Sequence, residues 1–283
     1  KDSTIAMHER HVEKNIIPEI GNISLQKLSV VHVRTMIERW EKRNMGVRSI
    51  QIARNVLSAA LRDAMKREYI FRNVARLVDV PKSEPKPRHV WTAEEVRTFL
   101  AYAKKYRYYE LFLLMFTYGL RRGEACGLLW KNIDFDNDTI HVRQQLYSVR
   151  GVVKLGTLKT PESRRDLTLT PILKEALQAE YERRGCPAED EFVFVTQVGT
   201  PVHTRSLLRT FKYHAAMAGL KPITIHEIRH TVATLLKEAG VPMKEIQSIL
   251  GHSSIMTTMD IYAHSTTTEQ SKAINALMQG YGI

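Results

Sequence analysis

The sequence has 283 residues, of which 43% are hydrophobic and 25% are charged. This composition is typical of a soluble globular protein and excludes a disordered chain. There is no run of about 18 apolar residues that would form a membrane helix, and the first residues lack the apolar core of a secretory signal. Two cysteines, Cys126 and Cys186, are too few for a disulfide scaffold and fit a reducing cytoplasm.

The charge is strongly basic, with 42 Lys and Arg residues against 30 Asp and Glu, a formal net charge of +12. Such an excess indicates a nucleic-acid partner. An anionic membrane would attract the same charge, but binding there usually needs an amphipathic anchor or a dense basic cluster. Neither feature is obvious, so we expect no membrane partner.

The length predicts two domains, and three prolines show where the chain divides. Pro81, Pro85 and Pro87 remove backbone donors and bias the residues before them away from helix, so this stretch is expected to be extended. We therefore expect a helical domain over 1–80, a linker over 81–90, a larger domain over 91–264 and a C-terminal tail helix over 265–283.

The first domain is predicted to be all helical, with helices at 3–16, 29–43 and 48–67. Pro18 and Gly21 are expected to stop the first helix. The third helix has an apolar face at helical spacing and an opposite face of basic and amide groups. Such groups contact phosphates and base edges in DNA, although they suit a solvent-exposed face equally well. This polar stripe consists of Gln51, Arg54, Asn55, Ser58 and Arg62.

The second domain mixes helices and a few strands, so the predicted fold is mainly α with a small antiparallel β-sheet. A capping box from Thr92 to Glu95 starts one helix, and the apolar run at 111–120 predicts a buried helix that ends at Gly119. A polar turn predicts a hairpin over 133–146. Further strands are expected at 152–156, 164–169 and 192–195, and further helices at 123–130, after Pro171, and at 204–219, 226–240, 243–250 and 268–279.

Several groups in the second domain suit a phosphate ligand. Arg121 follows the buried helix, where a guanidinium is costly without an anionic partner. His226 and Arg229 are three residues apart on one predicted helix and so share a face. No metal-binding or nucleotide-binding motif accompanies them, and we expect neither a metal nor a cofactor. The domain contains the segments GLRRGE (119–124), LKTPESRR (158–165), HEIRH (226–230), LGH (250–252) and IY (261–262).

These five segments, in this order, resemble the motifs of the tyrosine recombinases, the phage integrase family. The resemblance covers essentially the whole chain: 1–80 resembles the family's core-DNA-binding domain, and 91–264 its catalytic domain. The motifs look most like those of integrases from conjugative transposons and prophages. The resemblance implies a site-specific recombinase that integrates and excises a mobile element. It would cleave and rejoin DNA strands through a 3′-phosphotyrosine intermediate, without metal or ATP.

The resemblance also implies a role for each motif residue. Tyr262 is the nucleophile, Lys159 protonates the departing 5′ oxygen, and His226 accepts the tyrosine proton and later returns it. The two motif arginines clamp the non-bridging oxygens with forked donors, and the histidine of the LGH segment adds a hydrogen bond. The expected catalytic set is Arg121, Lys159, His226, Arg229, His252 and Tyr262.

Residues beside the motifs receive other interpretations. Lys154 is an alternative to Lys159 as the acid, but it lies within a predicted strand. We expect Glu124 to orient the site and Arg122 to contact the DNA backbone. His230 is expected to be structural or to support the catalytic groups.

The implied partner is double-stranded DNA with attachment or transposon-end sites. Recombining two duplexes needs four strand cuts, so a tetramer is expected in the active synapse. The tail at 265–283 is expected to pack on a neighbouring subunit, or alternatively on its own domain. A directionality factor and a location at the bacterial nucleoid, in the cytoplasm, complete these expectations. Two other classes stay open: a type IB topoisomerase, which relaxes supercoils as a monomer, and a DNA-binding regulator with an inactive site.

Overall fold

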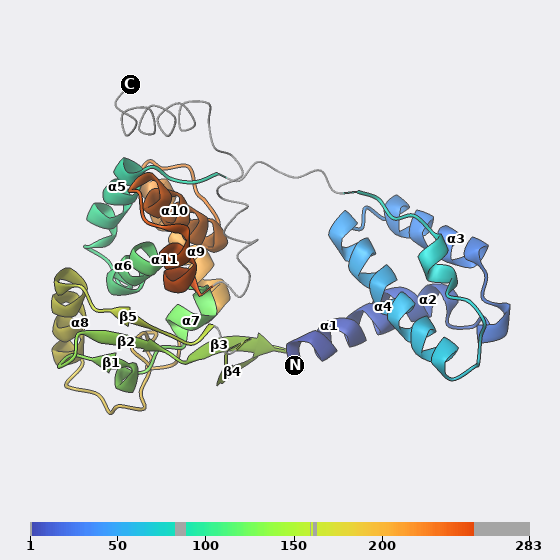
Figure 1. Cartoon of the computed structure of the whole chain (residues 1–283), viewed down its shortest axis with the longest axis horizontal. Helices are drawn as coiled ribbons and strands as arrows, with labels where there is room; N and C mark the ends of the chain where they lie inside the picture. The colour runs from blue at the N-terminus through green and yellow to red at the C-terminus, as the bar shows by residue number, and fades with distance from the viewer. Residues whose placement is uncertain (1, 83–88, 159, 161–162, 252–283) are drawn as a thin grey trace, which may run out of the picture. The chain divides into compact units, whose positions relative to one another are not determined.

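The computed structural model describes residues 2–82, 89–158, 160 and 163–251 (Figure 1). The chain divides into two compact units. The first comprises Lys1–Pro87 with Ser148–Val152, and the second comprises Arg88–Tyr147 with Val153–Ile283. No helix in the described ranges is long and apolar enough to cross a membrane.

The first unit is helical, as predicted. Its apolar core is formed by the faces of two long helices, with Trp40 and Met36 from one and Ile50 and Leu61 from the other almost completely buried. These residues recur at helical spacing in the sequence. The elements within Lys1–Pro87 are α1 (Asp2–His11), a π turn (Val12–Ile16), α2 (Ile17–Ile20), a 3₁₀ turn (Leu25–Lys27), α3 (Val30–Lys42), α4 (Val47–Lys66) and a second 3₁₀ turn (Val74–Leu77).

The prediction that Pro18 stops the first helix is wrong. Helical turns continue through Pro18 to Ile20, and Gly21 closes the segment by donating its N–H to Ile17 O at 2.9 Å. Pro18 lies in the first turn of α2, where a missing N–H is tolerated. The wider π turn at Val12–Ile16 directly precedes it, and such turns adjust the hydrogen-bond ladder where an ordinary α-helix would clash with the proline ring.

The described residues from 89 to 251 contain seven α-helices and five strands with short turns, as the mainly α prediction required. Three strands form an antiparallel sheet in the order β1-β2-β5, and β3 and β4 form a separate two-stranded sheet. Ile140 of β2 pairs with Ile133 of β1 and with Leu167 of β5. The helices are α5 (Ala93–Ala103), α6 (Tyr109–Tyr118), α7 (Arg122–Cys126), α8 (Pro171–Arg183), α9 (Thr204–Met217), α10 (Ile225–Glu238) and α11 (Met243–Leu250), and the strands are β1 (Ile133–Asp134), β2 (Thr139–Val142), β3 (Gln144–Val149), β4 (Val152–Thr157) and β5 (Arg165–Thr168).

Three predicted elements of this unit differ from the structure. The helix expected at 123–130 ends at Cys126, where Gly127 caps it. The hairpin expected over 133–146 is complete at Val142, and the following residues join β3 and pair with β4 instead. The expected strand at 192–195 is absent from the described residues, which show only isolated bridges there. Its apolar residues are explained by core packing, because Val193 and Phe194 are buried.

An aromatic cluster anchors the helices of the second unit around α6. Trp91 stacks on Phe116 with ring centroids 5.6 Å apart, and Phe99 and Phe211 pack on the same indole. In Figure 1, α10 and α11 lie beside α6, and the strands lie with α8 on the other side of α6. This packing brings the C-terminal end of α6 next to α10 and α11, and the candidate site forms there.

Candidate active site

The end of α6 positions Arg121. Gly119 caps the helix with a φ of +60°, a left-handed conformation that favours glycine. A Cβ at this position would lie 2.5 Å from Leu250 Cδ2, so the close approach of α11 also requires glycine. The chain reverses here and Arg121 becomes the N-cap of α7.

Glu124 connects two arginines from different parts of the chain. Its Oε1 accepts a hydrogen bond from Arg121 Nη1 at 2.6 Å, and its Oε2 accepts one from Arg165 Nη2 at 3.0 Å. The side chain is only 1% exposed. Burial acts to raise the pKa of this carboxyl, but Arg165 and Arg121 together hold it below its usual value. Glu124 therefore stays ionised and orients both guanidinium groups, as expected for it.

Arg229 is buried in the early part of α10. Thr224 starts this helix with a capping box, in which its Oγ1 accepts the Glu227 N–H at 3.2 Å. Arg229 Nη1 donates to Gly119 O at 3.0 Å, which places the side chain at the end of α6. Burial, and secondly the charge of Arg121, lower the pKa of Arg229 to about 9. The group is still charged at neutral pH, and an anion would relieve the unfavourable environment.

His226 lies one turn before Arg229 on the same helix. It is exposed, and its ring packs edge-on against the His230 ring with centroids 4.8 Å apart. The two rings are therefore in contact, and the supporting role expected for His230 stays a prediction. The predicted pairing of His226 and Arg229 on one helix is thus present in the structure.

The C-terminal end of α11 is held by the arginines of the site. Gly251 caps this helix with a φ of +64°. Its carbonyl oxygen accepts a hydrogen bond from Arg121 Nη2 at 2.9 Å, and the carbonyl of Ile249 accepts one from Arg165 Nε at 2.7 Å. The site thus includes the chain immediately before the predicted catalytic histidine at position 252.

Three predicted catalytic residues, Lys159, His252 and Tyr262, lie outside the described residues. The strands expected on either side of Lys159, at 152–156 and 164–169, are present, because β4 ends at Thr157 and β5 begins at Arg165. The alternative, Lys154, lies within β4 as expected and is exposed.

Arg165 is a site residue that the sequence interpretation missed. The available signal is the alternation along β5 and the residue after it, where Arg165, Leu167 and Leu169 are all buried and so share the inward face. A charged residue at an inward position of a strand needs buried partners. Those partners, Glu124 and the end of α11, are distant in sequence, so the motif alone did not reveal them.

The polar stripe on α4 is only partly available to a ligand. Asn55 and Arg62 are exposed, whereas Gln51 and Arg54 are half-buried. Gln51 Nε2 donates to Pro81 O at 2.9 Å, and so ties the helix to the segment that follows the unit's last turn. Ser58 does not lie on the exposed face as predicted: it is buried, and its Oγ accepts a hydrogen bond from Asn73 at 3.1 Å.

Arg122 stays a predicted DNA contact. It is exposed and directly follows Arg121. No described contact assigns it a role in the fold.

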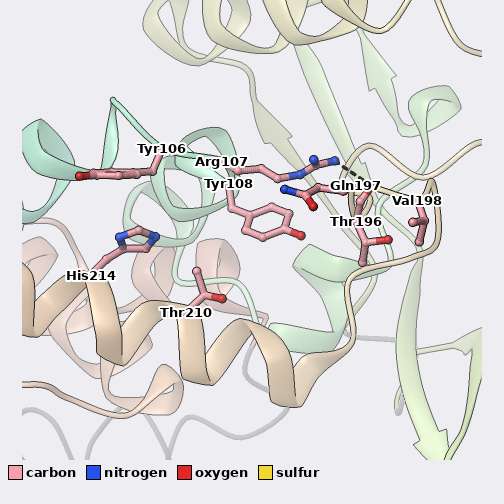
Figure 2. Close-up of a pocket in the computed structure, with 8 residues that line it drawn as sticks. All are labelled: Tyr106, Arg107, Tyr108, Thr196, Gln197, Val198, Thr210 and His214. Atoms are coloured by element: carbon pink, nitrogen blue, oxygen red, sulfur yellow. Dashed lines mark hydrogen bonds between the residues drawn. The ribbon is translucent and has the colours of Figure 1, made fainter.

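A separate cavity of about 480 Å³ lies at the opposite end of α6 (Figure 2). Arg107 reaches across it and donates to the carbonyls of Val195 and Thr196 at 2.9 and 2.8 Å. On α9, the His214 ring lies against Tyr106 with centroids 4.8 Å apart. None of the predicted catalytic residues that the structure describes lines this cavity, so it is not part of the arginine site.

The chain is similar in sequence to known integrases and tyrosine recombinases. The model of the phage integrase family matches residues 89–269. A protein of Caldanaerobacter subterraneus subsp. tengcongensis named tyrosine recombinase XerC-like is 26% identical, over 98% of this chain and 78% of its own length. The ICEBs1 integrase of Bacillus subtilis is 25% identical, over 94% of this chain and 75% of its own.

A solved structure extends the likeness to three dimensions. The Tn1549 transposon integrase, solved in complex with transposon right end DNA, superposes with a TM-score of 0.83 at 25% identity. The match covers 98% of this chain and 94% of that chain.

Proposed function

Because this chain belongs to the phage integrase family, we propose that it is a site-specific DNA recombinase that integrates and excises a mobile element. It acts on double-stranded DNA at attachment or transposon-end sites. The observation that carries this proposal is the convergence of Arg121, Arg165 and Arg229 on the ends of α6 and α11, with Glu124 between two of them. Such a cluster suits the negative charge that develops on a phosphate during strand transfer.

In the proposed reaction, the Tyr262 hydroxyl attacks the scissile phosphorus. A tyrosine has an unperturbed pKa near 10, so a base is needed at neutral pH, and His226 accepts the proton. The bond to the 5′ oxygen breaks, and Lys159 protonates that oxygen as it leaves. The product is a 3′-phosphotyrosine linkage and a free 5′-hydroxyl, so the energy of the broken ester is kept in the new one.

Rejoining is the reverse sequence with a 5′-hydroxyl from another duplex. That hydroxyl attacks the phosphotyrosine, and the proton returns to Tyr262 from His226. Arg121 and Arg229 hold the non-bridging oxygens in both steps, and His252 adds a hydrogen bond to them. Each chain supplies one nucleophile, so exchange of two duplexes requires four chains.

The remaining parts of the proposal concern partners and place. The first unit is assigned to core-site DNA, with Asn55, Arg62 and the half-buried Gln51 and Arg54 as candidate contacts. The tail at 265–283, outside the described residues, is assigned to a neighbouring subunit. A directionality factor and action at the bacterial nucleoid, in the cytoplasm, belong to the same proposal.

The test uses nicked suicide duplexes that carry candidate attachment sequences, in which the cleaved strand loses a short fragment and cannot be resealed. We expect a protein–DNA adduct that survives SDS and is absent with Tyr262→Phe. An adduct that persists in this variant would assign the nucleophile elsewhere. DNA that is bound without any adduct would indicate a passive binding protein. Relaxation of supercoils without exchange between labelled duplexes would indicate a topoisomerase.

A further inference from the structure

Arg165 connects three separate segments of the chain. Its side chain is 5% exposed. Nη2 donates to Glu124 on α7, Nε to the carbonyl of Ile249 near the end of α11, and Nη1 to the carbonyl of Ser163 at 3.0 Å. One guanidinium on β5 thereby joins α7, α11 and the turn that enters its own strand.

We propose that Arg165 is a positioning residue of the strand-transfer site, which aligns Arg121 for the scissile phosphate and fixes the end of α11 from which the catalytic segment continues. This inference rests on the proposed function. Arg165 is the last residue of the LKTPESRR segment, but it was not in the expected catalytic set, so the inference assigns a role to a further residue.

The alignment of Arg121 passes through Glu124. Oε1 of the carboxylate accepts from Arg121 Nη1, and Oε2 accepts both from Arg165 Nη2 and from the Arg121 backbone N–H at 3.1 Å. Arg165 therefore anchors the carboxylate to β5 in addition to the α7 backbone, and the carboxylate in turn holds the plane of the Arg121 guanidinium. If Arg165 were removed, Glu124 would keep its bonds to Arg121 but lose its anchor on β5, and the Arg121 guanidinium would be held less rigidly while keeping its charge.

The alignment of α11 passes through two backbone carbonyls. Arg165 holds Ile249 O and Arg121 holds Gly251 O. Together with the bonds to Glu124, these hydrogen bonds form a closed ring. Glu124 on α7 binds Arg165 on β5, Arg165 binds the end of α11, and Arg121 binds both the end of α11 and Glu124. His252 follows Gly251 in the sequence, so these hydrogen bonds hold the residue that directly precedes the predicted catalytic histidine.

The packing at Gly251 indicates that the guanidinium is closely fitted. A Cβ on Gly251 would lie 2.8 Å from Arg165 Nη1 and 3.2 Å from its Cζ. The planar fork of arginine can donate in three directions in one plane, whereas a lysine ammonium on a flexible stem cannot reproduce that geometry. The conservative change Arg165→Lys therefore keeps the charge and removes the alignment.

The experiment measures single-turnover adduct formation on a nicked duplex at saturating DNA, together with the DNA Kd and the Tm. Arg165→Lys is compared with Arg183→Lys, an exposed arginine on α8 that also pairs with a glutamate, Glu180. We expect Arg165→Lys to slow adduct formation by about 10- to 100-fold, the usual effect of losing a group that orients a reacting group. For the control Arg183→Lys, both the DNA Kd and the rate of adduct formation should stay within about twofold of wild type, since exposed ion pairs contribute little.

A second substrate separates alignment from a general loss of structure. A methylphosphonate at the scissile position replaces one charged oxygen by a methyl group and reduces the need for an aligned arginine clamp. We expect Arg165→Lys to slow cleavage of the phosphodiester at least tenfold more than cleavage of the methylphosphonate. A merely structural defect would slow both substrates equally, and that result would overturn the proposal.

Gly251→Ala provides an independent variant if Arg165→Lys does not fold. It displaces the guanidinium from the side of α11 without changing any charge, and the same selective loss on the phosphodiester is expected. If folded Gly251→Ala cleaved the phosphodiester and the methylphosphonate with the same ratio of rates as wild type, the proposal would be overturned. If wild type forms adduct and Arg165→Lys behaves as Arg183→Lys, this inference alone fails. If wild type forms no adduct on bound DNA, the proposed function fails, and this inference fails with it.

Discussion

Glu124→Gln tests how strongly the buried carboxylate stabilises the site. The substitution keeps the size of the side chain but removes the charge between Arg121 and Arg165, and it turns one acceptor into a donor. Removing one partner of a buried ion pair costs about 3–5 kcal/mol of unfolding free energy. Arg121 is 38% exposed, so solvent screens part of the interaction, and we expect about 3 kcal/mol, near the lower end of that range. For a unit of this size, this corresponds to a fall in Tm of about 6–12 °C at neutral pH.

The pH dependence has a defined sign. The folded-state pKa of Glu124 lies below the ordinary value of 4.5. Its stabilising effect is therefore fully present above that ordinary value and is lost as the pH falls through the lower, folded-state pKa. The Tm difference between wild type and Glu124→Gln should be largest near pH 7 and shrink at pH values below 4.5.

The matched control is Glu94→Gln. Glu94 pairs with Arg97 at 2.7 Å, nearly the same distance, but its side chain is 71% exposed, so little or no change in Tm is expected. Thermal unfolding followed by circular dichroism between pH 3 and pH 8, roughly the range in which a carboxyl titrates, provides both readouts. Equal Tm changes in the two variants, or a Tm difference that does not depend on pH, would refute the reasoning from burial.

Three further predictions concern the fold. Gly119→Ala should lower the Tm more than Gly185→Ala: both glycines have positive φ, but only at Gly119 does the new Cβ meet a neighbour, Leu250 Cδ2 at 2.5 Å. The extra cost should be about 1–3 kcal/mol of overpacking, and equal melting temperatures would contradict it. Asn73→Ala should cost about 1–3 kcal/mol in chemical denaturation, because the amide donates to Ser58 O at 2.7 Å in a buried position; an unchanged midpoint would argue against that bond. Burial raises the pKa of Cys126 to about 12, so a thiol reagent at pH 8 should label only the exposed Cys186 in the native protein, and mass spectrometry of Cys186→Ser should show no native labelling.

Local signals in the sequence predicted those elements that neighbouring residues determine. The capping box of Thr92 and Glu95 starts α5, and the apolar run before Gly119 forms α6 with that glycine as its cap. The motif arginines, Arg121 and Arg229, do meet in space. The first two features are fixed by side chains within a few residues of one another, whereas the meeting of the two arginines was predicted from the resemblance to known motifs.

Features that depend on distant contacts were missed. Arg165 bonds to Glu124, 41 residues away, and to Ile249, 84 residues away, and no periodicity reveals such partners. The spacing of Ser58 in the sequence assigns it to the polar face of α4, but in the structure Asn73 packs against it and donates a hydrogen bond to its hydroxyl. The apolar residues near Val193 resemble a strand because a buried irregular segment has the same composition as a buried strand.

The two glycines that end α6 and α11 also set the charge that a phosphate meets. Gly119 O and Gly251 O, which bind Arg229 and Arg121, lie at helix C-termini, where aligned peptide dipoles leave a partial negative charge. A partial charge orients a guanidinium without neutralising it. Within the described part of the site there are three arginines (+3) and one carboxylate (−1), Glu124, which leaves +2. Glu124 accepts hydrogen bonds from Arg121 and Arg165, whereas Arg229 donates to Gly119 O. Had carboxylates anchored every arginine, the cluster would be neutral, and the protein would have to break ion pairs before it could receive an anion.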